Sequence, residues 1–260
     1  MSERAAVVVL QEAEQASERE RQLAQQLSLP LLPQAHLAGD SAVGFVLQYL
    51  PEGLSLSILE DNAPGPLAID FNAPRLLRRS RDSIRKQGLG KALGLARQKK
   101  LNILDATAGT GTDAFLMAVA GCAVTMLEKS PIVHALLTDA IARSAFAQEP
   151  VAVAVKNMEL HLADFLQFAR DKVQCDVVYM DPMFPDGVGS ARSQKPMYLL
   201  QQLLGKADRE ELMLAHALQL ARRRVVIKRN RKSPLVPGPN PDIQFKGSSS
   251  RYDVYLVKSG

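Results

Sequence analysis

The spacing of hydrophobic and polar residues divides the chain into two parts. In the first part, short apolar runs separated by turn residues predict strands over 5–10, 43–50, 54–59 and 67–71. One helix is expected over 12–26, where charged and amide side chains dominate and apolar residues are few. We therefore predict a small, mainly β lobe at the N-terminal end of the chain.

From residue 101 onward, apolar runs of strand length alternate with helical segments. The expected strands are 101–104, 122–127, 158–162, 176–180, 225–228, 243–245 and 252–257, and the expected helices are 113–120, 131–146 and 208–221. Such alternation predicts an α/β fold, a Rossmann-like and mostly parallel sheet with helices on both faces. We divide the chain into an N-terminal lobe, residues 1–74, and an α/β domain, residues 75–260.

Composition narrows the class of protein. Of the 260 residues, 47% are hydrophobic and 23% charged, which excludes a wholly disordered chain. The apolar runs are too short to cross a bilayer, and the first residues do not resemble a signal peptide, so we expect a cytoplasmic protein without a membrane partner. The two cysteines and four histidines show no metal-ligand spacing, so no metal is expected.

Positive charge is concentrated in two segments, although the net charge of the whole chain is only +5. The segment 75–100 holds ten basic residues and one acid. A second cluster contains no acid and consists of Arg222, Arg223, Arg224, Lys228, Arg229, Arg231 and Lys232. Basic clusters of this kind favour a polyanionic partner.

Acidic residues follow four of the predicted strands. Asp105, Glu128 and Asp181 each end an apolar run, and Asp164 comes shortly after another. The carboxyl ends of parallel strands share one edge of a sheet, and ligands of such sheets bind at that edge. We therefore expect these carboxylates to line a ligand site.

A glycine-rich turn follows the strand that ends at Asp105. Gly109 and Gly111 stand in a Gly-x-Gly-x-x-Ala pattern directly before a helix, which suits a sharp turn and close approach of the backbone to a ligand. Glu128, one strand later, has the spacing of an acid that accepts hydrogen bonds from ribose hydroxyls. The pattern fits a dinucleotide or S-adenosylmethionine (SAM).

The segment Asp181-Pro182-Met183-Phe184-Pro185 favours SAM over a dinucleotide. It resembles the proline loop of methyltransferases that modify amino groups on planar substrates. The Asp181 carboxylate would accept an amino N–H, Pro182 would stiffen the loop, and Phe184 would stack on the base. These three residues are the candidate catalytic residues.

Three longer motifs resemble the ribosomal RNA small subunit methyltransferase J family. They lie at 105–115, 126–131 and 179–185, and the resemblance extends from about 67 to 256, with only a loose match over the first 65 residues. Met183 agrees with that family's loop. The resemblance implies methyl transfer from SAM to N2 of a guanine near the 3′ end of small-subunit (16S) rRNA. It also implies that the partner is this rRNA or the assembling small ribosomal subunit.

The resemblance further implies the cofactor contacts. In addition to Asp105 and the two glycines, these are Thr112, Asp113, Glu128, Lys129, Asp164, Phe165 and Asp181. Two departures from the family pattern concern three of these residues: relatives commonly have Arg where this chain has Thr112, and small hydroxyl residues where it has Asp164 and Phe165.

Two alternatives remain open from the residues themselves. One is an amino methyltransferase that acts on DNA adenine or a protein amide, and the other is an RNA-binding protein with a degenerate cofactor pocket. For the leading hypothesis, we expect both basic clusters to contact RNA phosphates around the cleft. We expect Arg78, Arg79 and Arg81 not to reach the glycine turn.

Overall fold

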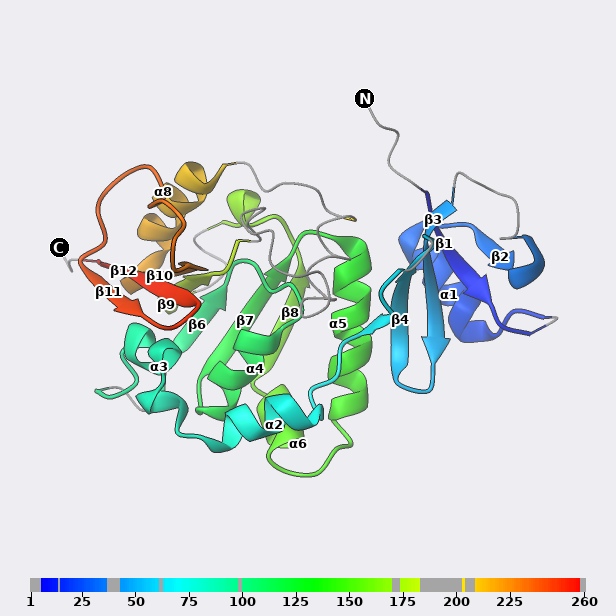
Figure 1. Ribbon diagram of the computed structural model, residues 1–260, viewed down its shortest axis with the longest axis horizontal. Helices are drawn as coiled ribbons and strands as arrows, with labels where there is room; N and C mark the ends of the chain where they lie inside the picture. The colour runs from blue at the N-terminus through cyan, green and yellow to red at the C-terminus, as the bar shows by residue number, and fades with distance from the viewer. Residues whose placement is uncertain are drawn as a thin grey trace.

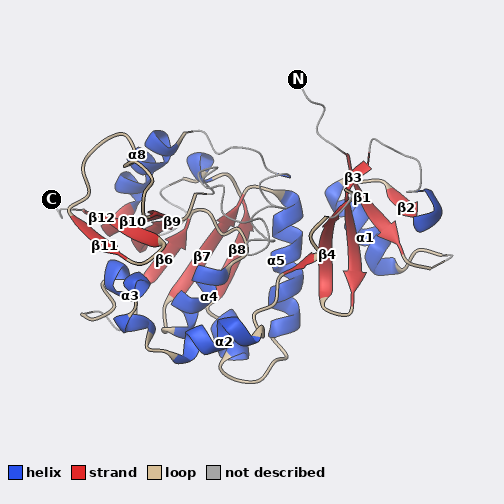
Figure 2. Cartoon of the chain, viewed as in Figure 1, coloured by secondary structure: helices blue, strands red, loops and turns tan. Residues whose placement is uncertain are grey.

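The chain builds two β-sheets, one in each predicted part (Figures 1 and 2). A computed structural model describes residues 6–13, 15–36, 43–60, 63–97, 100–169, 174–182, 203 and 209–257. The first sheet has the order β2-β1-β3-β4-β5. Its strands are β1 (Ala6–Gln11), β2 (Leu31–Pro33), β3 (Val43–Leu50), β4 (Gly53–Ile58) and β5 (Leu67–Ala68).

The N-terminal strands follow the apolar pattern, with two differences. Strand β2 was not predicted, because Pro30 precedes it and Pro33 is its last residue; it is a three-residue strand that pairs in parallel with β1 at the sheet edge. Strand β5 is shorter than predicted, since the chain leaves the sheet after Ala68. Helix α1 (Glu18–Leu27) begins later than expected, at a capping box formed by Ser17 and Glu20.

The second sheet has seven strands in the order β11-β12-β10-β9-β6-β7-β8. Strands β6 to β10 run parallel. At one edge, β12 pairs antiparallel with β10, and β11 pairs antiparallel with β12. The strands are β6 (Asn102–Asp105), β7 (Ala123–Glu128), β8 (Met158–Leu162), β9 (Cys175–Met180), β10 (Ala221–Asn230), β11 (Ile243–Lys246) and β12 (Ser250–Leu256). The order reverses between β6 and β9, which creates a ligand crevice at the carboxyl ends of these strands.

Helices cover both faces of this sheet, as the alternating pattern predicted. The helices are α2 (Pro74–Arg81), α3 (Gly88–Leu93), α4 (Thr112–Val119), α5 (Pro131–Ser144), α6 (Val151–Val155) and α8 (Glu210–Leu220). Short 3-10 turns are η1 (Gln34–His36), η2 (Ile84–Lys86) and η3 (Phe165–Gln167). Neighbouring strand residues face opposite layers: Ile103 belongs to the buried cluster that includes residues of α3, α4 and α5, whereas Leu104 belongs to the cluster that includes residues of α8 and η3.

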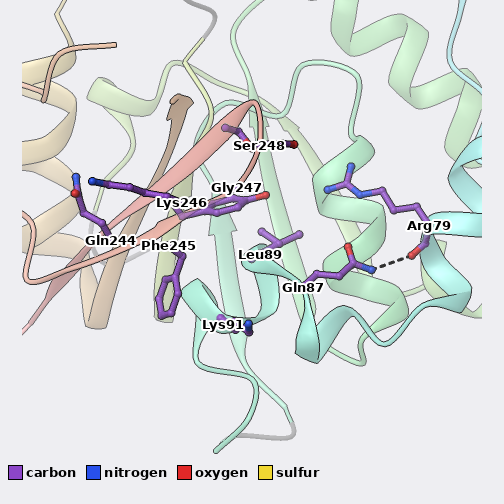
Figure 3. A pocket seen from close by; sticks show the side chains of 12 residues that line it. Arg79, Gln87, Leu89, Lys91, Gln244, Phe245, Lys246, Gly247 and Ser248 are labelled. Atoms are coloured by element: carbon purple, nitrogen blue, oxygen red, sulfur yellow. Dashed lines mark hydrogen bonds between the residues drawn. The ribbon is translucent and has the colours of Figure 1, made fainter. Parts of the chain in front are cut away.

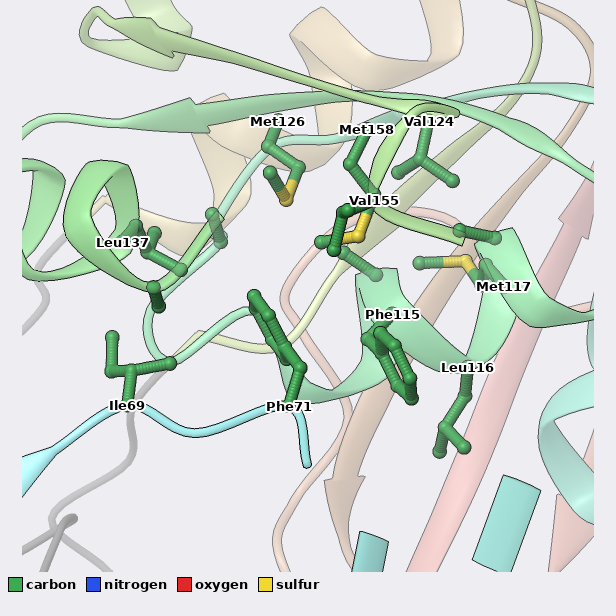
Figure 4. Close-up of a cluster of buried hydrophobic side chains, with 14 of the residues drawn as sticks. Ile69, Phe71, Phe115, Leu116, Met117, Val124, Met126, Leu137, Val155 and Met158 are labelled. Carbon is green, nitrogen blue, oxygen red and sulfur yellow. The ribbon is translucent and has the colours of Figure 1, made fainter. Parts of the chain in front are cut away.

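One hydrophobic core runs from the first sheet into the second. Phe71, just after the N-terminal sheet, stacks on Phe115 of α4 with ring centroids 5.1 Å apart (Figure 4). Helix α5 lies between the two sheets, and its Asp139 carboxylate accepts the Leu54 N–H of β4 at 2.9 Å (Figure 1). Within the described residues, no helix has the length and apolar character needed to span a membrane.

Candidate active site

The three strand-end acids meet at the carboxyl edge of the second sheet. Asp105 ends β6, Glu128 ends β7, and Asp181 directly follows β9. Two hydrogen bonds join the loop after β6 to the end of β9. The Ala106 N–H donates to the Tyr179 carbonyl at 2.9 Å, and the Asp181 N–H donates to Thr107 Oγ1 at 2.7 Å. The expectation that these acids share one edge is therefore confirmed.

The glycine turn is fixed by Glu128. Gly109 and Gly111 have positive φ angles of 54° and 69°, a backbone conformation that favours glycine. The Gly109 N–H donates to Glu128 Oε2 at 3.0 Å, and the Ser130 N–H donates to Oε1 at 2.8 Å. Burial raises the pKa of Glu128, and these two amide bonds oppose that rise. Each carboxylate oxygen keeps a second lone pair that can accept a ligand hydroxyl.

Asp105 is a buried acid with little hydrogen bonding to offset the cost of its burial. Its side chain is 2% exposed, and one described donor reaches it, the Thr107 N–H at 3.1 Å from Oδ1. Burial, together with the neighbouring charges of Asp113, Asp181 and Glu128, raises the pKa of Asp105 to about 8. Among the described residues, this buried carboxyl group therefore lacks a counter-charge, which a cationic group of a ligand could supply.

A lysine lies between the two remaining carboxylates. Lys228 Nζ is 2.7 Å from Asp113 Oδ2 and 2.6 Å from Asp181 Oδ2, and the Tyr179 hydroxyl also donates to Asp113 Oδ2 at 2.6 Å. Burial disfavours the charged ammonium, but the two carboxylates outweigh it and hold the pKa of Lys228 well above its usual range. The lysine therefore stays protonated.

The same network affects the two acids differently. Burial would raise the pKa of Asp113, but Lys228, Tyr179 and Arg79 together lower it. For Asp181, burial and the nearby Asp113 charge outweigh Lys228, and its pKa is raised. The Asp181 side chain is 34% exposed, so a substrate can reach it from solvent.

The structure corrects the expectation for the second basic cluster. Lys228 points to Asp113 and Asp181 rather than to an external phosphate. Arg229 is 3% exposed and pairs with Glu210 at 2.8 Å. Arg222 and Arg223 bond to Gln174 and Asp176 at the amino end of β9, on the edge opposite the site. Arg231 and Lys232 are exposed beyond the carboxyl end of β10, as expected.

The sequence did carry a signal for Lys228. It follows the apolar run Val225–Val226–Ile227, just as the candidate acids follow theirs, and β10 pairs in parallel with β9. The surrounding arginines obscured that position.

Arg79 also differs from the sequence-based expectation. Its guanidinium Nη2 lies 3.3 Å from Asp113 Oδ1, so the basic segment does reach the helix that follows the glycine turn. We expected Arg79 not to reach the glycine turn; its contact is with Asp113, a predicted cofactor residue directly after that turn. Arg78 and Arg81, in contrast, are exposed.

The remaining predicted cofactor-binding residues differ in their exposure and contacts. Thr112 opens α4 and its hydroxyl contacts that of Thr110 at 3.0 Å, while Lys129 is exposed. Asp164 caps η3 by accepting the Leu166 N–H at 2.9 Å. Phe165 is 3% exposed and packs edge-on against His216, so its ring belongs to the core.

The proline loop is described only at its start. Asp181 and Pro182 are within the described residues, and Pro182 is buried. Met183 and the candidate catalytic residue Phe184 lie outside them.

Comparison with known proteins identifies the family. A family model for SAM-dependent methyltransferases matches residues 30–257. Ribosomal RNA small subunit methyltransferase J from Coxiella burnetii is 40% identical over 243 residues, which cover 93% of each chain. The chain belongs to this methyltransferase family. The match reaches well into the N-terminal part, further than the sequence motifs indicated.

Two other similar proteins support the same family assignment. The protein of the same name from Thioalkalivibrio sulfidiphilus is 37% identical over 94% of this chain and 95% of its own. The crystal structure of a SAM-dependent methyltransferase from Neisseria gonorrhoeae superimposes with a TM-score of 0.70 and 27% identity, covering 98% of this chain and 97% of that one. The chain is thus a SAM-dependent methyltransferase with a Rossmann-like fold.

The site fits the chemistry of SAM, which carries a positive sulfonium and an ammonium group. Asp105 is a buried carboxyl group with a single described donor, and Glu128 holds the glycine turn while retaining free lone pairs. A side-chain carbon built on Gly109 would meet only the Thr107 carbonyl, at 3.8 Å, so this turn leaves room for a ligand. The described residues contain no group of acids, histidines and cysteines suited to a metal ion.

Proposed function

We propose that this enzyme methylates N2 of a guanine in small-subunit rRNA. The observation that carries the proposal is the Asp181 carboxylate. Lys228 holds its Oδ2 at 2.6 Å, whereas no described residue donates to its Oδ1. The Asp181 side chain is 34% exposed at the end of β9, so its carboxylate can accept an N–H of an exocyclic amine.

The amine is a weak nucleophile because its lone pair is delocalised into the ring. When bound, SAM supplies a methyl group attached to a positively charged sulfur. Asp181 would orient the amino group and stabilise the positive charge that develops on its nitrogen. Pro182 would restrict the loop that presents the base, and Phe184 would stack on it.

The cofactor contacts are also part of the proposal. Glu128 would accept the ribose hydroxyls, and Asp105, Gly109, Gly111, Thr112, Lys129, Asp164 and Phe165 would complete the pocket. For Phe165 the core position of the ring leaves its backbone as the contacting group. Asp113 already bonds to Arg79, Tyr179 and Lys228, so we propose that it holds the catalytic edge together as well as lying next to SAM.

The choice of rRNA over DNA or protein is supported by the names of the relatives and by the exposed basic residues of 75–100. The intact glycine turn and the Lys228 network favour an active enzyme over a binding protein with a degenerate pocket.

The test is methyl transfer from labelled SAM to small-subunit rRNA, to duplex DNA and to ribosomal protein, with mass mapping of the modified nucleotide. Asp181→Asn should lower kcat at least about 100-fold, since removing one preorganised charge-stabilising group costs on that order. Asp176→Asn makes the same chemical change at the other end of β9 and should retain activity. Label on adenine or protein, or full activity of Asp181→Asn, would contradict the proposal.

A further inference from the structure

A cleft of about 430 Å³ opens beside the active site (Figure 3). One wall is the β11–β12 hairpin, from Gln244 to Ser248, with Ser250 and Tyr252. The opposite wall is the segment Gln87–Lys91, and Arg79 of α2 closes one end. The cleft is large enough to hold part of a ligand chain.

The lining of the cleft suits a polyanion. It contains three cationic side chains, Arg79, Lys91 and Lys246, and no acidic one. Lys91 and Lys246 are exposed on opposite walls, and the structure records no acidic partner for either ammonium group within the described residues. Lys246 extends along the hairpin wall on the side away from Arg79 (Figure 3). Ammonium groups on the walls of one groove can bind phosphates of a nucleic acid strand.

The cleft also offers surfaces for bases. The Phe245 ring lines it and is partly exposed, and Phe245 pairs across the hairpin with Tyr252, which lines the same cleft. Unpaired bases stack on such aromatic rings, whereas bases in a duplex are not available for stacking. The cationic side chains of the cleft and the partly exposed Phe245 ring together therefore favour binding of a single-stranded nucleic acid.

The position of the cleft connects it to the reacting groups. Arg79 lines the cleft and also bonds to Asp113, whose carboxylate shares Lys228 with Asp181. A strand that follows the cleft toward Arg79 thus approaches the edge where Asp181 lies.

We propose that this cleft binds the single-stranded RNA segment next to the target guanine, with its phosphates at Lys91 and Lys246 and a base against Phe245. The proposal rests on the function proposed above, because it assumes that the strand in the cleft carries the guanine. It assigns substrate binding to the hairpin and to α3, and it separates this role from the catalytic role of Asp181.

The experiment compares two double variants with the same change of charge. Lys91→Glu/Lys246→Glu reverses both cleft lysines, and Arg21→Glu/Lys156→Glu reverses two exposed basic residues outside both basic clusters. Steady-state methylation of an rRNA transcript is measured against RNA concentration at several salt concentrations. SAM affinity is measured by calorimetry without RNA.

For the cleft variant we expect the KM for RNA to rise about tenfold or more, because two phosphate contacts are lost. The slope of log affinity against log salt should fall by about 1.4, the value for two contacts to a single strand. Extrapolated kcat and the Kd for SAM should stay within about twofold of wild type, and the control variant should match wild type in every measurement.

Equal KM values for the two double variants, with active wild type, would overturn the cleft proposal and leave the proposed function intact. Wild-type enzyme that binds SAM but methylates no rRNA would overturn both. If the charge-reversed variant does not fold, Lys91→Gln/Lys246→Gln serves instead, and it should raise KM in the same direction. A larger effect on a duplex than on a single-stranded transcript would also contradict the proposal.

Discussion

At the scale of single residues, the site depends on one ammonium group held between two carboxylates. The acids of this cluster could be predicted, because Asp105, Glu128 and Asp181 end apolar runs and parallel strands bring such ends together. Lys228 could not be predicted by that argument alone, since its role depends on β10 lying beside β9 in register. Its contacts imply that it positions Asp181 and opposes the rise in the pKa of Asp181 that burial causes.

Replacing Lys228 by methionine removes the counter-charge of Asp181 while keeping most of the side-chain volume. Without the ammonium the pKa of Asp181 should rise, because Lys228 opposes the effect of burial. A reaction that needs the carboxylate is lost as the pH falls through this pKa, so the acidic limb of the kcat–pH profile should move to higher pH. The measurement is kcat between about pH 6 and 9 at saturating substrates.

Lys228→Arg keeps the charge and should restore the position of the acidic limb. The same fractional loss for Lys228→Met at every pH would show that the lysine does not act through the ionisation of Asp181.

At the scale of elements, the turn between β6 and α4 places Asp113 at the start of α4 and is held by Glu128. The sequence predicted this turn, since two glycines follow an apolar strand. It did not predict the different surroundings of the two glycines. A side-chain carbon on Gly111 would lie 2.8 Å from Leu137 Cδ2 and 3.1 Å from Phe71 Cζ, whereas the same carbon on Gly109 would make an ordinary van der Waals contact with the Thr107 carbonyl oxygen at 3.8 Å.

This difference yields a matched pair of variants. Gly109→Ala should lower the free energy of unfolding by about 1–2 kcal/mol, the cost of a left-handed backbone conformation for alanine. Gly111→Ala carries the same cost together with overpacking against Leu137 and Phe71, which adds about 1–3 kcal/mol. Urea denaturation of the two variants without ligand measures both values. Equal losses would mean that the neighbours of Gly111 adjust freely.

At the scale of the whole molecule, the pattern predicted two parts but not how they join. Alternation of strands and helices was sufficient for a mostly parallel sheet, yet the strand order depends on long-range packing that no local pattern encodes. The division near residue 74 stays a prediction. The sheets are separate, but Leu47 and Leu56 of the first sheet belong to the same core cluster as Phe71 and Leu137.

Helix α5 supplies the polar part of this junction. Asp139, 10% exposed, accepts the Leu54 N–H at 2.9 Å and the Arg143 Nε–H at 2.7 Å, and Arg143 donates in turn to the Ile69 carbonyl at 2.6 Å. These bonds tie β4 and the connecting segment to the helix. The shared core and these bonds together imply that the lobe and the methyltransferase domain unfold as one unit.

Asp139→Ala tests this coupling, because it removes the carboxylate that accepts from the Leu54 N–H and the Arg143 Nε–H. We expect the free energy of unfolding to fall by about 1–3 kcal/mol, the cost of unsatisfied buried donors. Native-state hydrogen exchange should show the same loss of protection in β4 and in β7, since both open in one event. Asp82→Ala, at an exposed acid of the basic segment, should leave both strands unchanged. Loss of protection in β4 alone would show instead that the N-terminal lobe opens independently of the catalytic sheet.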